Sequence, residues 1–86
     1  MDSKQEVLPN PRKVLSDMLR VNQNTIKPES RLGDLPGWDS LSHVSVLLEL
    51  EKVYGIKVSR QAYEKCSTMS GIIEFLGEKG VTYIAD

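Results

Sequence analysis

The sequence has none of the features that mark several common protein classes. A single cysteine, Cys66, excludes an internal disulfide and any metal site built from several cysteines. There is no run of about eighteen apolar residues and no charged leader followed by an apolar segment. We therefore expect neither a membrane span nor a signal peptide, and a cytoplasmic protein that does not contact a membrane.

The chain also lacks an excess of positive or negative charge. The 11 lysine and arginine residues almost balance the 12 aspartate and glutamate residues, so the formal net charge is −1. A nucleic-acid-binding protein needs a basic surface, and nucleic acid is therefore not an expected partner. Glu29, Asp34 and Asp39 lack the spacing of a calcium loop, so no metal site is expected. A chain of 86 residues suits one small domain and is too short for a deep enzyme cleft.

The most regular stretch of the chain follows a break at Pro36-Gly37. Residues 40 to 54 have the pattern of a helix, with Asp39 before them as an N-cap and Gly55 after them as a left-handed C-cap. Ser40 therefore belongs to the first turn of a helix. Unpaired backbone N–H groups and the positive end of the helix dipole favour an anionic group attached there.

Three further helices are expected around this one. The apolar periodicity predicts a first helix over roughly residues 11 to 20, a short third helix over residues 59 to 65, and a last helix that begins after Ser67 or Thr68 and runs to about Glu78. The last helix carries an apolar stripe at helical spacing: Met69, Ile72, Ile73 and Leu76. The predicted fold is all-α, a small four-helix bundle with a long first loop and a short third helix.

One domain accounts for residues 1 to 86, because no repeat, low-complexity segment or linker divides them. Residues 1 to 9 are polar and interrupted by proline, so we expect a flexible arm there, and residues 80 to 86 form a tail. The loop over residues 21 to 38 is long for a compact domain. We expect it to be held against the bundle by its isolated apolar residues: Ile26, Leu32 and Leu35.

The apolar residues of the central helix fall into two groups when they are projected at about 100° per residue. One group forms a core face: Val46, Leu47, Leu50, Val53 and Tyr54. The second group is a narrower stripe of Leu41, Val44 and Leu48. Either the helix is buried over a wide arc, or the second stripe is a surface on which a partner docks.

The motif Asp39-Ser40-Leu41, the apolar helix after it and the ending Gly55-Ile56-Lys57-Val58 resemble an acyl carrier protein of the stand-alone type. The resemblance extends from about Leu32 to Leu76 and, more loosely, through the first helix. In that family the serine is esterified by 4′-phosphopantetheine from coenzyme A, whose thiol carries acyl groups as thioesters. The resemblance implies that Ser40 is the attachment site and that Asp39 helps the modifying transferase to engage it.

The resemblance implies roles for further residues as well. Four of them are expected to contact partner enzymes: Leu41, Val44, Leu48 and Glu51. Four others are expected to line an interior pocket for the acyl chain: Val46, Leu50, Tyr63 and Cys66. Tyr63 is larger than the residue that many carriers have at this position, so we expect it to limit the length of the chain.

The expected partners are a phosphopantetheinyl transferase, a ligase or acyltransferase that loads acyl or aminoacyl groups, and downstream synthase or transferase enzymes. The chain itself is expected to be a monomer and not an enzyme. Ser42, Ser45 and Lys52 replace acidic residues that are common in fatty-acid carriers. Docking is therefore expected to depend less on charge, which argues against enzymes of general fatty-acid synthesis as partners. Trp38 gives the form Gly-Trp-Asp-Ser-Leu, which resembles carriers of specialised pathways, such as polyketide or nonribosomal assembly or cell-surface modification. Trp38 could equally be a plain anchor of the loop.

Two functions from other classes compete with this interpretation. An unmodified helical interaction module would dock through Leu41, Val44 and Leu48 without any prosthetic group. A serine hydrolase has little support, because Ser40 lacks the Gly-x-Ser-x-Gly setting and the only histidine, His43, lies three residues along the same helix. We expect His43 to face the bundle or its rim.

Overall fold

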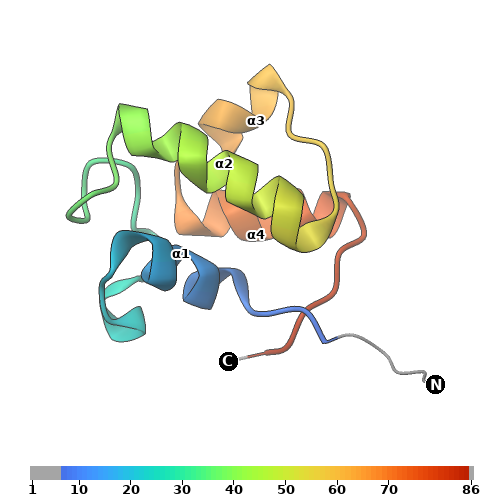
Figure 1. Cartoon of the computed structure of the whole chain (residues 1–86), viewed down its shortest axis with the longest axis horizontal. Helices are drawn as coiled ribbons and strands as arrows, with labels where there is room; N and C mark the ends of the chain where they lie inside the picture. Colours follow the sequence, from blue (N-terminus) through green and yellow to red (C-terminus); the bar gives the residue numbers. More distant parts are fainter. Residues whose placement is uncertain (1–6, 86) are drawn as a thin grey trace.

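The computed structural model describes residues 7 to 85, and Figure 1 shows their arrangement. Four α-helices and one short 3₁₀ helix follow one another along the chain: α1 (Pro11–Leu19), η1 (Gln23–Thr25), α2 (Ser40–Tyr54), α3 (Arg60–Lys65) and α4 (Met69–Glu78). Within the described residues there is no β-strand, only an isolated bridge between Arg31 and Thr68. The predicted all-α fold with a long first loop and a short third helix is confirmed.

The helix boundaries follow local capping signals. Asn10 accepts a hydrogen bond from the N–H of Arg12 at 2.9 Å, and Pro11 occupies the first turn of α1. Of the two candidate caps for α4, the structure selects Thr68, whose hydroxyl accepts from the N–H of Gly71 at 2.9 Å. None of the described helices combines the length and the apolar character that a membrane crossing requires.

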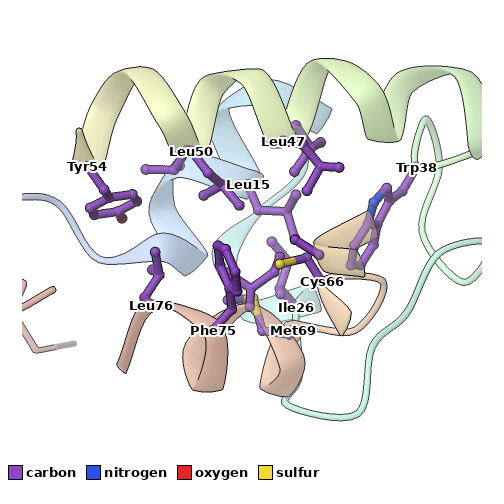
Figure 2. Packing of buried hydrophobic residues seen from close by; sticks show 14 residues of the cluster. Leu15, Ile26, Trp38, Leu47, Leu50, Tyr54, Cys66, Met69, Phe75 and Leu76 are labelled. Atoms are coloured by element: carbon purple, nitrogen blue, oxygen red, sulfur yellow. The ribbon is translucent and has the colours of Figure 1, made fainter. Parts of the chain in front are cut away.

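The core fills the space between α2 and α4, as Figure 2 shows, and α1 also contributes buried residues. The face of α2 predicted for the core is buried at Val46, Leu47, Leu50 and Tyr54 and partly buried at Val53. The apolar stripe of α4 is not buried along its whole width, because the side chain of Ile73 is 41% exposed. The buried arc of α4 is centred near Ile72 and extends to Phe75 instead, which leaves Ile73 on its flank.

The loop between α1 and α2 is held against the bundle by apolar contacts and by backbone hydrogen bonds. Ile26 is fully buried, and Leu32 and Leu35 are partly buried against the core, as the sequence predicted. In addition, the N–H of Leu32 donates to the carbonyl of Ser67 at 2.7 Å, and the N–H of Met69 donates to the carbonyl of Ser30 at 2.8 Å. The loop that leads to Ser40 is therefore fixed to the start of α4.

The described parts of the predicted arm and tail meet at one end of the molecule. The N–H of Ile84 donates to the carbonyl of Leu8 at 3.0 Å, and the hydroxyl of Tyr54 donates to the carbonyl of Pro9 at 2.6 Å. Most of the predicted arm, residues 1 to 6, lies outside the described residues. Both terminal segments therefore lie near the end of α2 that is opposite Ser40 (Figure 1).

Candidate functional site

Ser40 is an exposed residue at the first position of α2. The loop turns into the helix at Gly37, whose φ of 82° lies in the left-handed region that favours glycine. Within the described residues, the Ser40 hydroxyl forms no hydrogen bond. The loop therefore presents the Ser40 hydroxyl to solvent without a hydrogen-bond partner among the described residues.

The residues around Ser40 form a reciprocal helix cap. The Asp39 carboxylate accepts from the N–H of Ser42 at 2.8 Å, and the Ser42 hydroxyl oxygen accepts from the N–H of Asp39 at 3.0 Å. The Ser42 hydroxyl also donates to the carbonyl of Gly37. The sequence predicted Asp39 as the cap but did not assign this role to Ser42.

These hydrogen bonds keep Asp39 charged. The bonds from the backbone and the hydroxyl of Ser42 hold the pKa of the Asp39 carboxyl below its ordinary value of 3.8. Because the side chain is fully exposed, its negative charge is open to a basic group of another molecule. The residue directly before Ser40 therefore carries a charged carboxylate at neutral pH.

Behind Ser40 lies a buried polar network that the sequence did not predict. His43 is completely buried, and Trp38 is almost completely buried. The indole Nε1–H of Trp38 donates to Nδ1 of His43 at 3.0 Å, and Nε2 of His43 lies 2.9 Å from the carbonyl oxygen of Tyr63. The structure therefore shows Trp38 as an anchor of the loop, and it places His43 inside the bundle, as expected.

Tyr63 returns from α3 to the beginning of α2. Its ring packs edge-on against the ring of His43, with centroids 4.7 Å apart, and its hydroxyl donates to the carbonyl oxygen of Ser40 at 3.1 Å. No sequence signal indicates this contact, because Tyr63 lies 23 residues away from Ser40. The half-buried side chain is thus at the rim of the bundle and beside the serine.

The second stripe of α2 is a free surface. Leu41 is 83% exposed, Leu48 is 60% exposed and Val44 is 48% exposed. The interpretation that α2 is buried over a wide arc is therefore wrong. The stripe begins directly after Ser40 and runs along the outside of the helix.

Glu51, the fourth residue expected to contact partners, has a structural bond of its own. Its carboxylate accepts from the N–H of Val58 at 2.8 Å and so ties the connection between α2 and α3 to α2. The residue as a whole is half-exposed.

A groove of about 220 Å³ lies between α2 and α3, next to the exposed stripe. It is lined by Val44, Leu47, Leu48, Glu51, Val58, Ser59, Arg60 and Tyr63. Of the four residues expected to line an interior acyl pocket, only Tyr63 lines this groove. Val46, Leu50 and Cys66 lie in the hydrophobic core of the bundle, so their expected role in holding an acyl chain stays a prediction.

Cys66 and the acidic residues offer no alternative chemistry. Burial raises the pKa of the Cys66 thiol to about 11, so the thiol is protonated at neutral pH. Within residues 7 to 85, no group of three or more histidine, cysteine, aspartate or glutamate side chains could hold a metal ion.

Comparison with known proteins gives a consistent result. Residues 12–76 match the family described as a phosphopantetheine attachment site. An acyl carrier protein of Thermotoga maritima is 30% identical over 79 residues, which cover 92% of this chain and 98% of that protein. An acyl carrier protein of Chlorobium phaeobacteroides is 33% identical over 66 residues, which cover 77% and 85% of the two chains.

A third relative extends the comparison to another group of organisms. The acyl carrier protein of Thermosynechococcus vestitus is 26% identical over 74 residues, which cover 86% of this chain and 91% of that protein. The family match spans α1 to α4, and the relatives are of similar length to this chain. The chain belongs to the phosphopantetheine-attachment family of acyl carrier proteins, which are carriers and not enzymes and bear a covalent 4′-phosphopantetheine group.

Proposed function

We propose that Ser40 is the attachment site of 4′-phosphopantetheine and that the chain carries acyl or aminoacyl groups for a specialised biosynthetic pathway. The observation that carries the first part is the exposed, unpaired hydroxyl of Ser40 at the start of α2. When attached, the group supplies a terminal thiol that holds acyl groups as thioesters.

The surroundings of Ser40 suit a phosphodiester. The positive end of the α2 dipole favours a negative charge there, and no large side chain covers the exposed serine. Asp39 remains charged beside it, and we infer that a basic group of the modifying transferase pairs with this carboxylate. Membership of the family implies that the chain meets such a transferase and enzymes that handle acyl groups.

The proposal of a specialised pathway rests on the charge of α2. Three residues of α2 replace acidic residues that are common in fatty-acid carriers. Ser45 and Lys52 are exposed and carry no negative charge, and Ser42 forms part of the helix cap. Trp38 adds no support, because its burial against His43 explains it fully. We infer that partner enzymes recognise the exposed apolar stripe of α2 more than its charged residues. These partners are the loading ligase or acyltransferase and the downstream synthases, and we propose that they meet the carrier in the cytoplasm.

This recognition can be tested through its salt dependence. A partner that docks through charge binds more weakly as salt screens the attraction, whereas apolar docking changes little. We expect the affinity for a fatty-acid transferase that selects acidic carriers to be low, even at low salt. Tight, salt-sensitive binding of that enzyme would place this chain in general fatty-acid synthesis instead.

The attachment site itself is tested by intact mass. The protein is incubated with coenzyme A and a broad-specificity phosphopantetheinyl transferase, and we expect a gain of one phosphopantetheinyl unit. Ser40→Ala should gain nothing, whereas Ser45→Ala, which removes another exposed serine of α2, should be modified like the unaltered protein. Circular dichroism shows whether each variant is folded.

An unmodified helical interaction module is the competing function, and the exposed stripe of Leu41, Val44 and Leu48 favours it. It makes the opposite prediction in the same experiment. A folded protein that gains no mass, and whose partners bind it equally well with Ser40→Ala, would replace the carrier proposal with this one.

A further inference from the structure

A chain of hydrogen bonds surrounds the backbone that bears Ser40. It leads from Trp38 in the loop to His43 in α2, from His43 to the carbonyl of Tyr63 in α3, and from the hydroxyl of Tyr63 back to the carbonyl of Ser40. We propose that Trp38, His43 and Tyr63 are positioning residues, which hold the Ser40 hydroxyl in the orientation that phosphopantetheinyl transfer requires. This inference rests on the proposed attachment to Ser40.

The chemistry of the indole determines the direction of the bonds. Trp38 Nε1–H can only donate, so Nδ1 of His43 must accept. The ring proton is then on Nε2, which donates to the Tyr63 carbonyl. His43 is therefore held as one neutral tautomer with both ring nitrogens paired, as a completely buried imidazole requires.

The network holds the serine from both sides. Trp38 lies two residues before Ser40, and its ring is buried against His43. Tyr63 binds the carbonyl of Ser40 itself. The segment from Trp38 to Ser40 is thus restrained at both ends. His43 binds the Trp38 ring at the loop end, and Tyr63 binds the Ser40 carbonyl at the helix end. Such restraint lowers the cost of placing the hydroxyl for attack.

A purely structural role for the network is the alternative, and Tyr63 allows the two to be separated. Its side chain is half-buried, so Tyr63→Phe removes the bond to Ser40 and leaves the ring against His43. Tyr54 provides a matched control, because its hydroxyl also donates to a backbone carbonyl, that of Pro9, at the opposite end of α2. Tyr54→Phe makes the same chemical change far from the serine.

The test is the steady-state kinetics of phosphopantetheinyl transfer to each folded variant. Loss of one neutral hydrogen bond that acts in the transfer should lower kcat about two- to tenfold for Tyr63→Phe, while the KM for coenzyme A stays unchanged. Tyr54→Phe should lower the melting temperature but leave kcat unchanged. A Tyr63→Phe protein that is modified with the kcat of the unaltered protein would overturn the inference.

A spectroscopic measurement tests the buried half of the network. The chain has one tryptophan, so the indole N–H of Trp38 gives a single, assignable NMR signal. In His43→Asn the side-chain amide oxygen can lie near the former position of Nδ1 and accept the bond from Trp38. In His43→Gln the amide lies near the former position of Nε2 and cannot accept it. We expect the indole signal to move further in His43→Gln than in His43→Asn, and kcat to fall in the same order. An indole signal that is unmoved in both folded variants would contradict the bond to His43.

The mass measurement separates the two proposals. If Ser40→Ala accepts the phosphopantetheinyl unit, the attachment site is wrong and the kinetic comparison does not concern Ser40. If modification requires Ser40 but Tyr63→Phe matches the unaltered protein, the attachment site stands and the positioning role is wrong.

Discussion

The two faces of α2 are built from the same residue types and have opposite environments. Leu48 is 60% exposed, whereas Leu50, two residues further along, is 1% exposed. Val44 and Val46 form a second such pair, exposed and buried respectively. Figure 2 shows Leu50 pointing from α2 toward α4. The exposure of an apolar residue in this helix is thus decided by the helix that packs against it and not by its own hydrophobicity.

The comparison also separates stability from recognition. The buried face contributes to folding because its side chains leave water and contact one another. The exposed stripe gains nothing from the fold of this chain, and contiguous exposed apolar residues are typical of interaction sites. The stripe starts beside Ser40, so a partner that covers it would lie next to the attached arm.

The largest expected effect on stability is that of Leu50→Ala. Removing this side chain from the core leaves a cavity, which should lower the free energy of unfolding by about 2–5 kcal/mol. Leu48→Ala is the matched control and should change it by no more than about 0.5 kcal/mol. Urea denaturation of both variants measures the difference. Equal destabilisation would show that the two faces are not distinct.

Glu51→Ala tests a residue at the border between the faces. We expect a loss of about 1 kcal/mol in the free energy of unfolding, because the N–H of Val58 loses its acceptor. Glu51→Gln keeps a side-chain oxygen that can accept this bond and should lose less. If both variants are as stable as the unaltered protein, the bond does not help to hold the connection to α3, and a docking role alone would explain Glu51.

The N-terminal end of α2, which Asp39 caps, should be sensitive to acid. The lowered pKa of Asp39 means that the folded state favours the charged carboxylate. The resulting stability is present above the ordinary pKa of 3.8 and is lost as the pH falls through the lower value of the folded state. Thermal unfolding across this range should show a fall in melting temperature at acid pH.

Asp39→Asn is the control for this acid sensitivity. Asparagine can still accept the bond from the N–H of Ser42, but it does not titrate. The part of the acid dependence that comes from Asp39 should disappear in this variant. An identical pH profile in both proteins would assign the acid sensitivity to other carboxylates.

The smallest effect on stability is expected for Leu41→Ser combined with Leu48→Ser. Both side chains are exposed, so the free energy of unfolding should change by no more than about 0.5 kcal/mol for each. Recognition by a loading enzyme should weaken by roughly tenfold if these side chains anchor the interface, since truncation of an anchoring residue costs more than about 1 kcal/mol. The KM of that enzyme for the carrier measures this, and an unchanged KM would leave the stripe without a docking role.

Several features of the fold could be predicted from short stretches of sequence. Asp39 before Ser40 marked the start of α2, and Gly55 marked its end. These signals act through hydrogen bonds and dihedral angles within a few residues, so they do not depend on the rest of the molecule. The proposal of Ser40 as the attachment site rests on the same local signals together with the family motif.

Features that arise from packing between helices were missed. Ile73 fits the helical spacing of α4 as well as its buried neighbours do, yet it lies outside the buried arc, which Phe75 completes. The hydrogen bond from Tyr63 to the carbonyl of Ser40 was not foreseen either, because it joins α3 to the beginning of α2. Periodicity gives the spacing of a face but not the position of its centre.

The sequence alone was enough to predict four helices and to place Ser40 in the first turn of α2, because backbone conformation and capping depend mainly on neighbouring residues. The packing of α3 against α2 determines that Glu51 binds the backbone of Val58 and that Tyr63 reaches the carbonyl of Ser40. The same packing brings the carbonyl oxygen of Tyr63 within hydrogen-bonding distance of Nε2 of the buried His43 ring. Contacts between residues 20 or more positions apart require the helices to be in place first, and no local pattern encodes them.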